Sequence, residues 1–323
     1  MIENIPKVEL HIHLDGSIRP STAAYLLNKS IDDVSNNMIA SDKCEDLNEY
    51  LTKFDYPEKI LQTKENLERV AYELALDLKK DNVIYAEIRF APLKHIKEGL
   101  TLDSIVDSVL EGLSKVNIKT NLILCMMRND TYDDNLKVIE LASKYLNRGV
   151  VGIDLAGAEA LYKTSSFEKL FDIAKKYNIP FTIHSGEADG YDSILAAINF
   201  GTTRIGHGIK AIEYDDLINL IKDNNILLEV CPTSNVQTNA VDKYTDHPIK
   251  KLIDKGVNVS INTDNRTVSN ISLNLEYKKL QESFGFTKEL FIKTNLNAIE
   301  HAFVSLDEKA KLKKEYLEII NKR

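Results

Sequence analysis

The sequence predicts an α/β fold, a (β/α)8 barrel, from two observations. Eight short runs of apolar and β-branched residues suit buried parallel strands, and segments with helical spacing separate most of them. A repeated strand-then-helix order indicates a parallel sheet, because parallel neighbours need crossover connections, and eight is the strand number of this barrel. A doubly wound open sheet is the alternative, but no G-x-G-x-x-G follows the first run.

The expected strands occur at regular places along the whole chain. They are residues 8–13, 83–92, 120–127, 150–157, 180–186, 204–208, 226–232 and 257–264. Helical spacing is clear before the fifth strand, where Phe167, Leu170 and Phe171 recur, and again at Leu217 and Ile221 before the seventh.

A helical insertion is expected after the first strand. About 70 residues separate the first two strands, far more than one crossover needs, and they contain successive helices around a break at Pro57. We expect this cap, at about residues 20–80, to cover the C-terminal mouth of the barrel. Its apolar side chains form either a lid or ordinary helix packing: Leu47, Leu51, Phe54, Tyr56 and Leu61. Extra helices rich in Lys and Glu follow the eighth strand, and residues 1–323 are predicted to form one domain.

Composition and charge exclude several classes of protein. The 323 residues are 43% hydrophobic and 28% charged, which is ordinary for a soluble globular protein, and no window approaches the ~18 apolar residues of a membrane span. A formal charge of −8 opposes binding to nucleic acid or a membrane surface. The N-terminus lacks a secretory pattern, and Cys44, Cys125 and Cys231 show no C-x-x-C spacing. We therefore expect a cytoplasmic protein with reduced cysteines.

Ligand-type side chains gather where the predicted strands end. His11 and His13 alternate on the first strand and so share one face, while His184, His207 and Asp264 end the fifth, sixth and eighth strands. All five would meet at the same mouth of the barrel. A lone buried histidine is usually a packing residue, but that explanation would have to apply at every strand end. Imidazoles with one carboxylate favour one zinc ion, with iron, cobalt or manganese as alternatives, and leave a position open for water.

The expected metal suggests hydrolysis. A metal can lower the pKa of its bound water from about 15.7 toward about 7, which makes hydroxide available as a nucleophile. Glu187 follows His184 by three residues and is expected to begin the next helix, where it either donates a proton to a substrate nitrogen or caps that helix. His207, between Gly206 and Gly208, either orients the hydroxide and stabilises an oxyanion or is itself a ligand. These residues predict a mononuclear metal hydrolase acting on a small nitrogenous substrate.

Eight motifs in order give a resemblance to a known family. HIHLDGS, FDYPEKILQTKENLERVAYELA, EIRFAP, DLAG, HSGE, RIGHG, CPTSN and SINTDN span nearly the whole chain, which resembles the adenosine deaminase family of metal-dependent amidohydrolases. The resemblance implies hydrolysis of adenosine and 2′-deoxyadenosine to inosine and 2′-deoxyinosine plus ammonia, in purine salvage. It implies one zinc ion per chain, and it gives each site residue a role. Zinc would be held by His11, His13, His184 and Asp264, Glu187 would protonate purine N1, His207 would position the hydroxide, Asp15 would meet the ribose 5′-hydroxyl, Ser17 would line that pocket and the Gly157 backbone would meet N3.

Two positions depart from the family pattern. The family often has a second aspartate where this chain has Asn265, and an acidic residue where it has Ala158. Purine N7 is an acceptor, and the Asn265 amide can donate to it without being protonated first, so we expect Asn265 to be competent.

Other substrates of the same chemistry remain open. They are adenine, adenosine monophosphate (AMP) and N6-methyl nucleotides, with Arg266 as the one candidate for a phosphate contact, and a catalytically silent binding protein is the alternative of a different class. His95, His247 and His301 are expected to be surface or packing residues.

Overall fold

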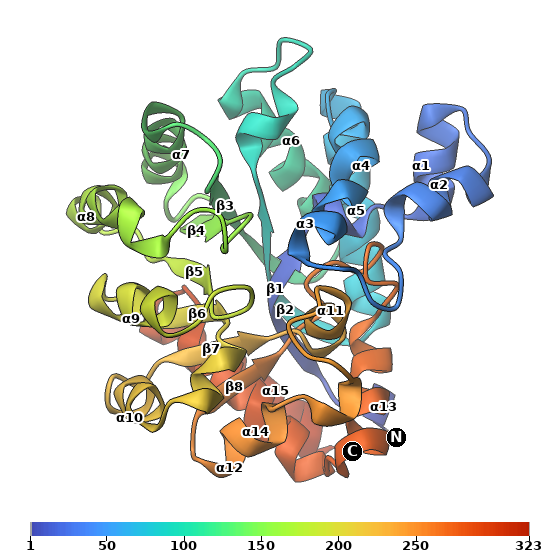
Figure 1. The fold of residues 1–323 in the computed structure, drawn as a ribbon. Helices are drawn as coiled ribbons and strands as arrows, with labels where there is room; N and C mark the ends of the chain where they lie inside the picture. Colours follow the sequence, from blue (N-terminus) through green and yellow to red (C-terminus); the bar gives the residue numbers. More distant parts are fainter. Residues whose placement is uncertain (1, 323) are drawn as a thin grey trace.

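The computed structural model describes residues 2–322, in which parallel strands are surrounded by helices (Figure 1). The strands form two four-stranded parallel sheets, in the orders β1-β2-β3-β4 and β5-β6-β7-β8. They are β1 (Lys7–His13), β2 (Val83–Phe90), β3 (Lys119–Met127), β4 (Val150–Ala156), β5 (Thr182–Ser185), β6 (Arg204–His207), β7 (Leu227–Val230) and β8 (Asn258–Ile261).

Single parallel bridges join the two sheets at both outer edges. Ile153 of β4 bridges Phe181, which precedes β5, and Ile12 of β1 bridges Asp264, which follows β8. At the second bridge, His13 N–H donates to the Asp264 carbonyl (2.7 Å) and Asp264 N–H donates to the His11 carbonyl (3.0 Å). Asp264 is therefore held beside the two histidines of β1 by the backbone itself.

The predicted fold class is confirmed, and each of the eight predicted runs overlaps one observed strand; β1 and β3 begin one residue earlier than predicted. The observed strands are shorter than most of the runs, as at predicted residues 180–186, where the strand is Thr182–Ser185. The residues that the prediction added after the strands lie in the loops that carry the polar side chains.

Helices separate most of the strands and cover them on the outside (Figure 1). They are α1 (Pro20–Leu27), α2 (Ile31–Met38), α3 (Leu47–Leu51), α4 (Asp55–Ile60), α5 (Lys64–Lys80), α6 (Leu102–Ser114), α7 (Tyr132–Tyr145), α8 (Glu168–Lys176), α9 (Tyr191–Asn199), α10 (Asp215–Asp223), α11 (Pro232–Gln237), α12 (Ile249–Asp254), α13 (Leu273–Phe284), α14 (Lys288–His301) and α15 (Leu306–Asn321). Short 3-10 turns lie at Ile2–Asn4, Asp15–Ser17, Thr52–Phe54, Pro92–His95, Thr164–Phe167, Ile209–Glu213 and Tyr244–Asp246.

Helix α5 shows why these segments are helical. The Thr63 side chain accepts from Asn66 N–H and so caps the first turn, and the apolar residues recur at helical spacing on one buried face. That face packs against α6, where a Cβ on Gly112 would lie 2.1 Å from the Glu68 carbonyl. Only glycine allows the two helices to approach this closely.

The segment between β1 and β2 is helical, as predicted, but it does not break at Pro57. Pro57 lies in the first turn of α4, where its missing N–H costs no helical hydrogen bond, and the break comes at residues 61–63 before α5. In Figure 1 α1 and α2 lie far from the strands, while α3 approaches them. The single domain, with an insertion at about 20–80, stays a prediction.

Helices α13, α14 and α15 follow β8, in agreement with the predicted extra helices. Ala298 and Ile299 of α14 pack with Val8, Leu10 and Tyr85 at the beginning of the strands, which is the end opposite the polar loops. None of the helices within residues 2–322 has both the length and the apolar character needed to span a membrane.

Candidate active site

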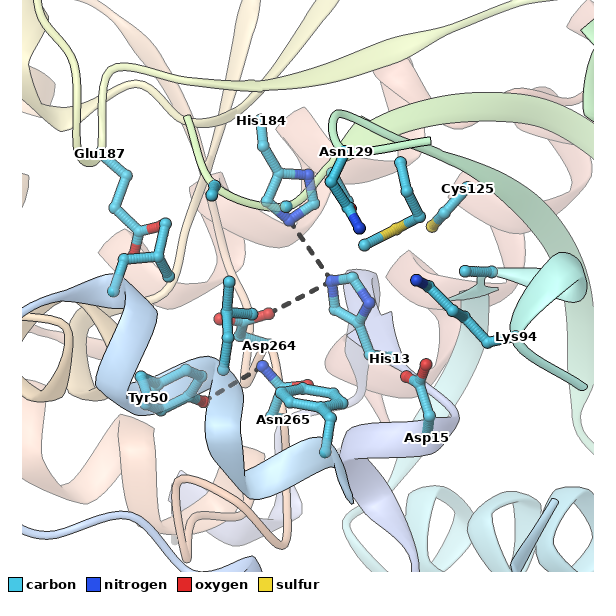
Figure 2. Close-up of a pocket in the computed structure, with 18 of the residues that line it drawn as sticks. His13, Asp15, Tyr50, Lys94, Cys125, Asn129, His184, Glu187, Asp264 and Asn265 are labelled. Carbon is cyan, nitrogen blue, oxygen red and sulfur yellow. Dashed lines mark hydrogen bonds and ion pairs between the residues drawn. The ribbon is translucent and has the colours of Figure 1, made fainter. Parts of the chain in front are cut away.

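A cavity of about 260 Å³ lies where the strands end and the α3 segment covers them. Its apolar wall includes Leu47, Leu51 and Phe54, so three of the five expected lid residues face it. The other two do not line it, because the Tyr56 hydroxyl donates to Asp33 and Leu61 is fully buried in the main core. In Figure 2 Glu187 lies at one end of the cavity and Lys94 at the other.

Four predicted ligands converge at the bottom of this cavity. One ligand atom each from His11, His13, His184 and Asp264 lies within 4.8 Å of all the others. His13 Nε2 is 3.3 Å from His184 Nε2 and 3.4 Å from Asp264 Oδ1, and Figure 2 shows these contacts. The structure therefore brings together side chains from β1, from β5 and from the loop after β8.

This donor set fits a divalent metal. His11 Nε2 is buried without a hydrogen-bond partner among the described residues, although it lies 3.3 Å from Asp264 Oδ1. Two ring nitrogens facing each other at 3.3 Å, with a carboxylate oxygen beside them, are lone-pair donors directed at a common point. A cation there would satisfy all of them at once.

Carboxylates behind two of the ligands hold the imidazole rings in place. Asp154 Oδ2 lies 2.9 Å from His184 Nδ1, and Glu229 Oε2 lies 2.9 Å from His11 Nδ1. A carboxylate at Nδ1 keeps the proton on that nitrogen and leaves Nε2 free to bind a metal. Arg89 joins the two carboxylates, because its Nη1 donates to Asp154 (2.9 Å) and its Nη2 to Glu229 (2.8 Å).

Further buried charged side chains contact these carboxylates on the side away from the ligands. Arg204 donates from Nε to the other Glu229 oxygen (2.6 Å) and from Nη1 to Glu87, and these side chains are fully buried. Burial opposes ionisation of Glu229, but the Arg204 and Arg89 guanidinium groups hold its pKa well below its usual range. For Asp154, too, burial is outweighed by His184 and Arg89, so its pKa is lowered. We call Asp154, Arg89, Glu229, Arg204 and Glu87 the charge ladder.

Glu187 has a different environment. Its Oε1 accepts from Asn235 Nδ2 (3.1 Å) and from the Thr238 hydroxyl (2.9 Å), and its Oε2 lies 3.5 Å from His207 Nε2. Burial raises the pKa of Glu187 to about 8, and the Asp264 carboxylate acts in the same direction. A carboxyl group that holds its proton at neutral pH can act as a general acid.

The loop that carries Glu187 is fixed by another carboxylate, that of Glu159. Its Oε1 accepts from Gly186 N–H (2.6 Å) and the Ser193 hydroxyl (2.6 Å). Its Oε2 accepts from the N–H groups of Glu187 (3.1 Å), Ala188 (2.7 Å) and Asp189 (3.0 Å). We call this arrangement the Glu159 clamp. The prediction that Glu187 begins the next helix is wrong, because α9 begins at Tyr191. The alternative helix-capping role is also wrong, because Gly190 is the N-cap of α9.

His207 ends β6 in a left-handed conformation, with φ of 63°, and is buried. The glycines on either side of it allow close packing against other residues, because a Cβ on Gly206 would lie 3.1 Å from His11 Cε1 and one on Gly208 would lie 2.6 Å from a Leu228 methyl carbon. Burial and the nearby His11 hold the pKa of His207 well below its usual range, so the ring is neutral.

The predicted substrate contacts are only partly brought together. Asp15, Gly157 and Asn265 line the cavity, and Asn265 Nδ2 donates to the Tyr50 hydroxyl (3.1 Å). Ser17 does not line it, because its hydroxyl turns back and donates to the His13 carbonyl (2.6 Å). The expected pocket contact of Ser17 is therefore corrected to a local backbone contact.

Several residues of the site were not singled out from the sequence. Asn235 and Thr238 contact Glu187, and Asn235 is the last residue of the CPTSN motif. Lys94 lines the cavity and lies 3.7 Å from Asp130, whereas Arg266 pairs with Asp81 and faces a separate cleft. No pattern in the sequence singled out Lys94, which lies in the short 3-10 turn Pro92–His95 after β2.

Comparisons with known proteins identify the family. Residues 6–319 match the family model described as adenosine deaminase. Proteins named adenosine deaminase from Clostridium kluyveri and Enterococcus faecalis are 42% and 40% identical to the chain; the alignments cover 99% and 95% of it and 96% and 95% of the relatives.

Solved structures of similar proteins include Arabidopsis ADAL complexed with IMP, with a TM-score of 0.89 and 28% identity over 98% of this chain and 97% of that one. They also include adenine deaminase from Arthrobacter aurescens, with a TM-score of 0.87 and 25% identity over 98% and 99%. An Arabidopsis N6-mAMP deaminase has a TM-score of 0.89 and 28% identity over 98% and 99%.

Proposed function

The chain belongs to the adenosine deaminase family, and from this premise we propose that it hydrolyses adenosine and 2′-deoxyadenosine to inosine products and ammonia. The observation that carries the proposal is the pairing of two features in one cavity: a convergent metal-ligand group and, beside it, a carboxyl group with its pKa raised to about 8. Free cysteines at 44, 125 and 231 suit the cytoplasm, where we place the reaction, in purine salvage.

We propose zinc as the metal, held by His11, His13, His184 and Asp264, because imidazoles with one carboxylate suit that ion. When bound, the metal supplies a water activated for attack on carbon. Elemental analysis of the purified protein should find about one divalent metal per chain, since four protein ligands fill most of a single coordination sphere. Two metals per chain, or full activity after verified metal removal, would contradict this part of the proposal.

The side chains around the cavity perform the remaining steps. Glu187 donates its proton to purine N1, which makes the ring carbon electrophilic, and the neutral His207 orients the attacking group by hydrogen bonding. Asn265 donates to N7 and the Gly157 backbone contacts N3, so the base is held through two of its ring nitrogens. Gly157 has φ of +102°, a conformation that favours glycine at this turn.

The opposite end of the cavity suits a ribose without a phosphate. Asp15 lies there, and the nearby cation, Lys94, is held by Asp130. A phosphate would need an unpaired cation at this end, and Arg266 cannot supply one because it pairs with Asp81 in a separate cleft.

The loss of ultraviolet absorbance on deamination separates the possible substrates in one assay. Adenosine and 2′-deoxyadenosine should have the highest kcat/KM, with adenine and AMP far lower. A higher kcat/KM for AMP or adenine than for adenosine would overturn the proposed substrate, while leaving the deaminase chemistry in place.

A further inference from the structure

His247 is a buried histidine that the mechanism above does not use. It is 2% exposed, precedes α12, and has a hydrogen-bond partner at each ring nitrogen. Nδ1 lies 3.1 Å from Ile249 N, and Nε2 lies 3.2 Å from Asn235 Oδ1. A backbone N–H can only donate, so Nδ1 accepts and the proton of the neutral ring is on Nε2. Burial lowers the pKa of His247 to about 3, in keeping with a neutral ring.

The protonated Nε2 of His247 determines the orientation of the Asn235 amide. Its hydrogen can be accepted only by Oδ1, so the amide NH₂ turns toward the active site. There Nδ2 has two acceptors, Glu187 Oε1 and His207 Nδ1, each at 3.1 Å. A reversed amide would direct its NH₂ at the protonated Nε2 of His247, so two donors would face each other and that hydrogen bond would be lost.

Asn235 in turn determines where two protons lie. The Asn235 NH₂ can only donate, so His207 Nδ1 accepts and the ring proton of His207 is on Nε2. Glu187 Oε1 already accepts from both Asn235 and Thr238, so the proton of the carboxylic acid is on Oε2. Glu187 Oε2 and His207 Nε2 are 3.5 Å apart, and both residues line the cavity.

We infer that His247 is a positioning residue: through Asn235, it keeps the proton of His207 on Nε2 and the acid proton of Glu187 on Oε2. The inference rests on the proposed function for the role of Glu187, but the hydrogen-bond order itself does not. It also assigns His207 a chemical role, because a neutral ring with its proton on Nε2 donates a hydrogen bond from that atom and does not accept a proton there.

Two substitutions at His247 and one control test this inference in the metal-loaded enzyme. His247→Phe keeps a buried ring but removes both hydrogen bonds, and kcat for adenosine should fall about tenfold or more while KM changes far less, since a hydrogen bond is worth roughly this factor. His247→Gln should recover part of the loss, because its amide can accept from Ile249 and donate to Asn235.

His95→Phe is the matched control. His95 is also fully buried, it stacks on Phe90, and neither of its ring nitrogens has a partner among the described residues. The same substitution there should leave kcat unchanged. A loss of kcat as large in His95→Phe as in His247→Phe would show that the effect is only one of packing.

Nuclear magnetic resonance of protein labelled with ¹⁵N at histidine reads the proton position directly. The His207 signals, assigned by their loss in His207→Gln, should show the proton on Nε2 in wild type and a mixed or reversed tautomer in His247→Phe. A wild-type His207 protonated on Nδ1 would overturn the inference even if the variants failed to fold, and so would a wild-type kcat in His247→Phe. A wild type with the expected tautomer but no turnover of adenosine would instead overturn the proposed function.

Discussion

The two sides of the cavity are equally buried but hold carboxyl groups in opposite states. On the metal side, Asp154 and Glu229 each accept from Arg89 in the charge ladder, and their pKa values are lowered. On the other side, Glu187 accepts only from an amide and a hydroxyl, and burial raises its pKa to about 8. The charge of the partner, and not the depth of burial, therefore decides which carboxyl group keeps a proton.

This difference separates two tasks that need opposite charges. The metal side must present ionised carboxylates and unprotonated Nε2 atoms, and the guanidinium groups of Arg89 and Arg204 stabilise that state. The acid side must deliver a proton, and the neutral donors Asn235 and Thr238 orient the carboxyl group without ionising it. The following substitutions test the acid side, the metal side, and then the parts of the cavity proposed to hold the base and the ribose.

Removing the proton donor should have the largest effect. Glu187→Gln keeps the shape of the side chain but cannot protonate N1, so kcat should fall by several orders of magnitude with metal content and folding unchanged. Steady-state kinetics with elemental analysis of the same sample measures both. Retention of more than about a tenth of wild-type kcat would assign the acid to another residue.

Breaking the charge ladder should mainly affect stability and metal binding. Arg89→Met leaves Asp154 and Glu229 buried without their shared cation, and the free energy of unfolding should fall by about 3 to 5 kcal/mol. Metal affinity, measured by chelator competition, should fall about 10- to 100-fold because the carboxylates orient the histidine ligands.

A partly exposed ion pair gives the control for this substitution. Arg19 makes two hydrogen bonds of 2.8 Å to Asp77 at the surface, and Arg19→Met should cost about 0 to 1 kcal/mol without changing metal affinity. Equal losses of stability in the two variants would mean that the ladder is no more important than a surface pair.

Substitutions at Asn265 test how the cavity recognises the purine base at N7. Asn265→Ala removes the proposed N7 donor and should cost about 1 to 3 kcal/mol of transition-state binding, measured from kcat/KM. Asn265→Asp should keep partial activity if its carboxyl group holds a proton. 7-Deazaadenosine lacks the N7 acceptor, so wild type should discriminate against it much more than Asn265→Ala does. The same discrimination by both enzymes would show that Asn265 does not contact N7.

The smallest effect is expected at the far end of the cavity. Asp130→Asn frees the Lys94 ammonium from its 3.7 Å partner, and kcat/KM for AMP should rise about tenfold at low salt while that for adenosine stays the same. Adding Lys94→Met should abolish the gain. If the ratio of AMP to adenosine activity does not change, Lys94 does not lie near the 5′ position.

Much of the fold and the ligand group could be predicted because both follow strand periodicity. Alternation put His11 and His13 on one face, and the common direction of parallel strands put His184 and Asp264 at the same end. The catalytic and substrate-binding roles of the site residues stay predictions until the experiments above are made. The ends of the helices were predicted less accurately than the strands. At Pro57 the expected break is absent, because proline is compatible with the first turn of a helix as well as with a break.

The contacts between side chains from distant segments could not be predicted. His247 lacked a metal-ligand neighbour in the sequence and was assigned to surface or packing, and it is indeed buried, but its partners Asn235 and Ile249 give it a directed pair of hydrogen bonds. Ser17 stands in a recognisable motif, yet its hydroxyl turns toward the chain because a carbonyl four residues earlier is the nearer acceptor.

The Glu159 clamp has a consequence for sequence variation in the loop it holds. Three of its four backbone donors come from Glu187, Ala188 and Asp189. These hydrogen bonds are made by backbone N–H groups and therefore do not depend on which side chain the residue carries. Position 188 can therefore accept other side chains, with proline as the exception, because proline has no N–H to donate. Position 189 is more restricted, because the Asp189 side chain itself accepts from Gly190 N–H (2.8 Å). A library randomised at position 188 and selected for activity should be depleted in proline more than in any other residue.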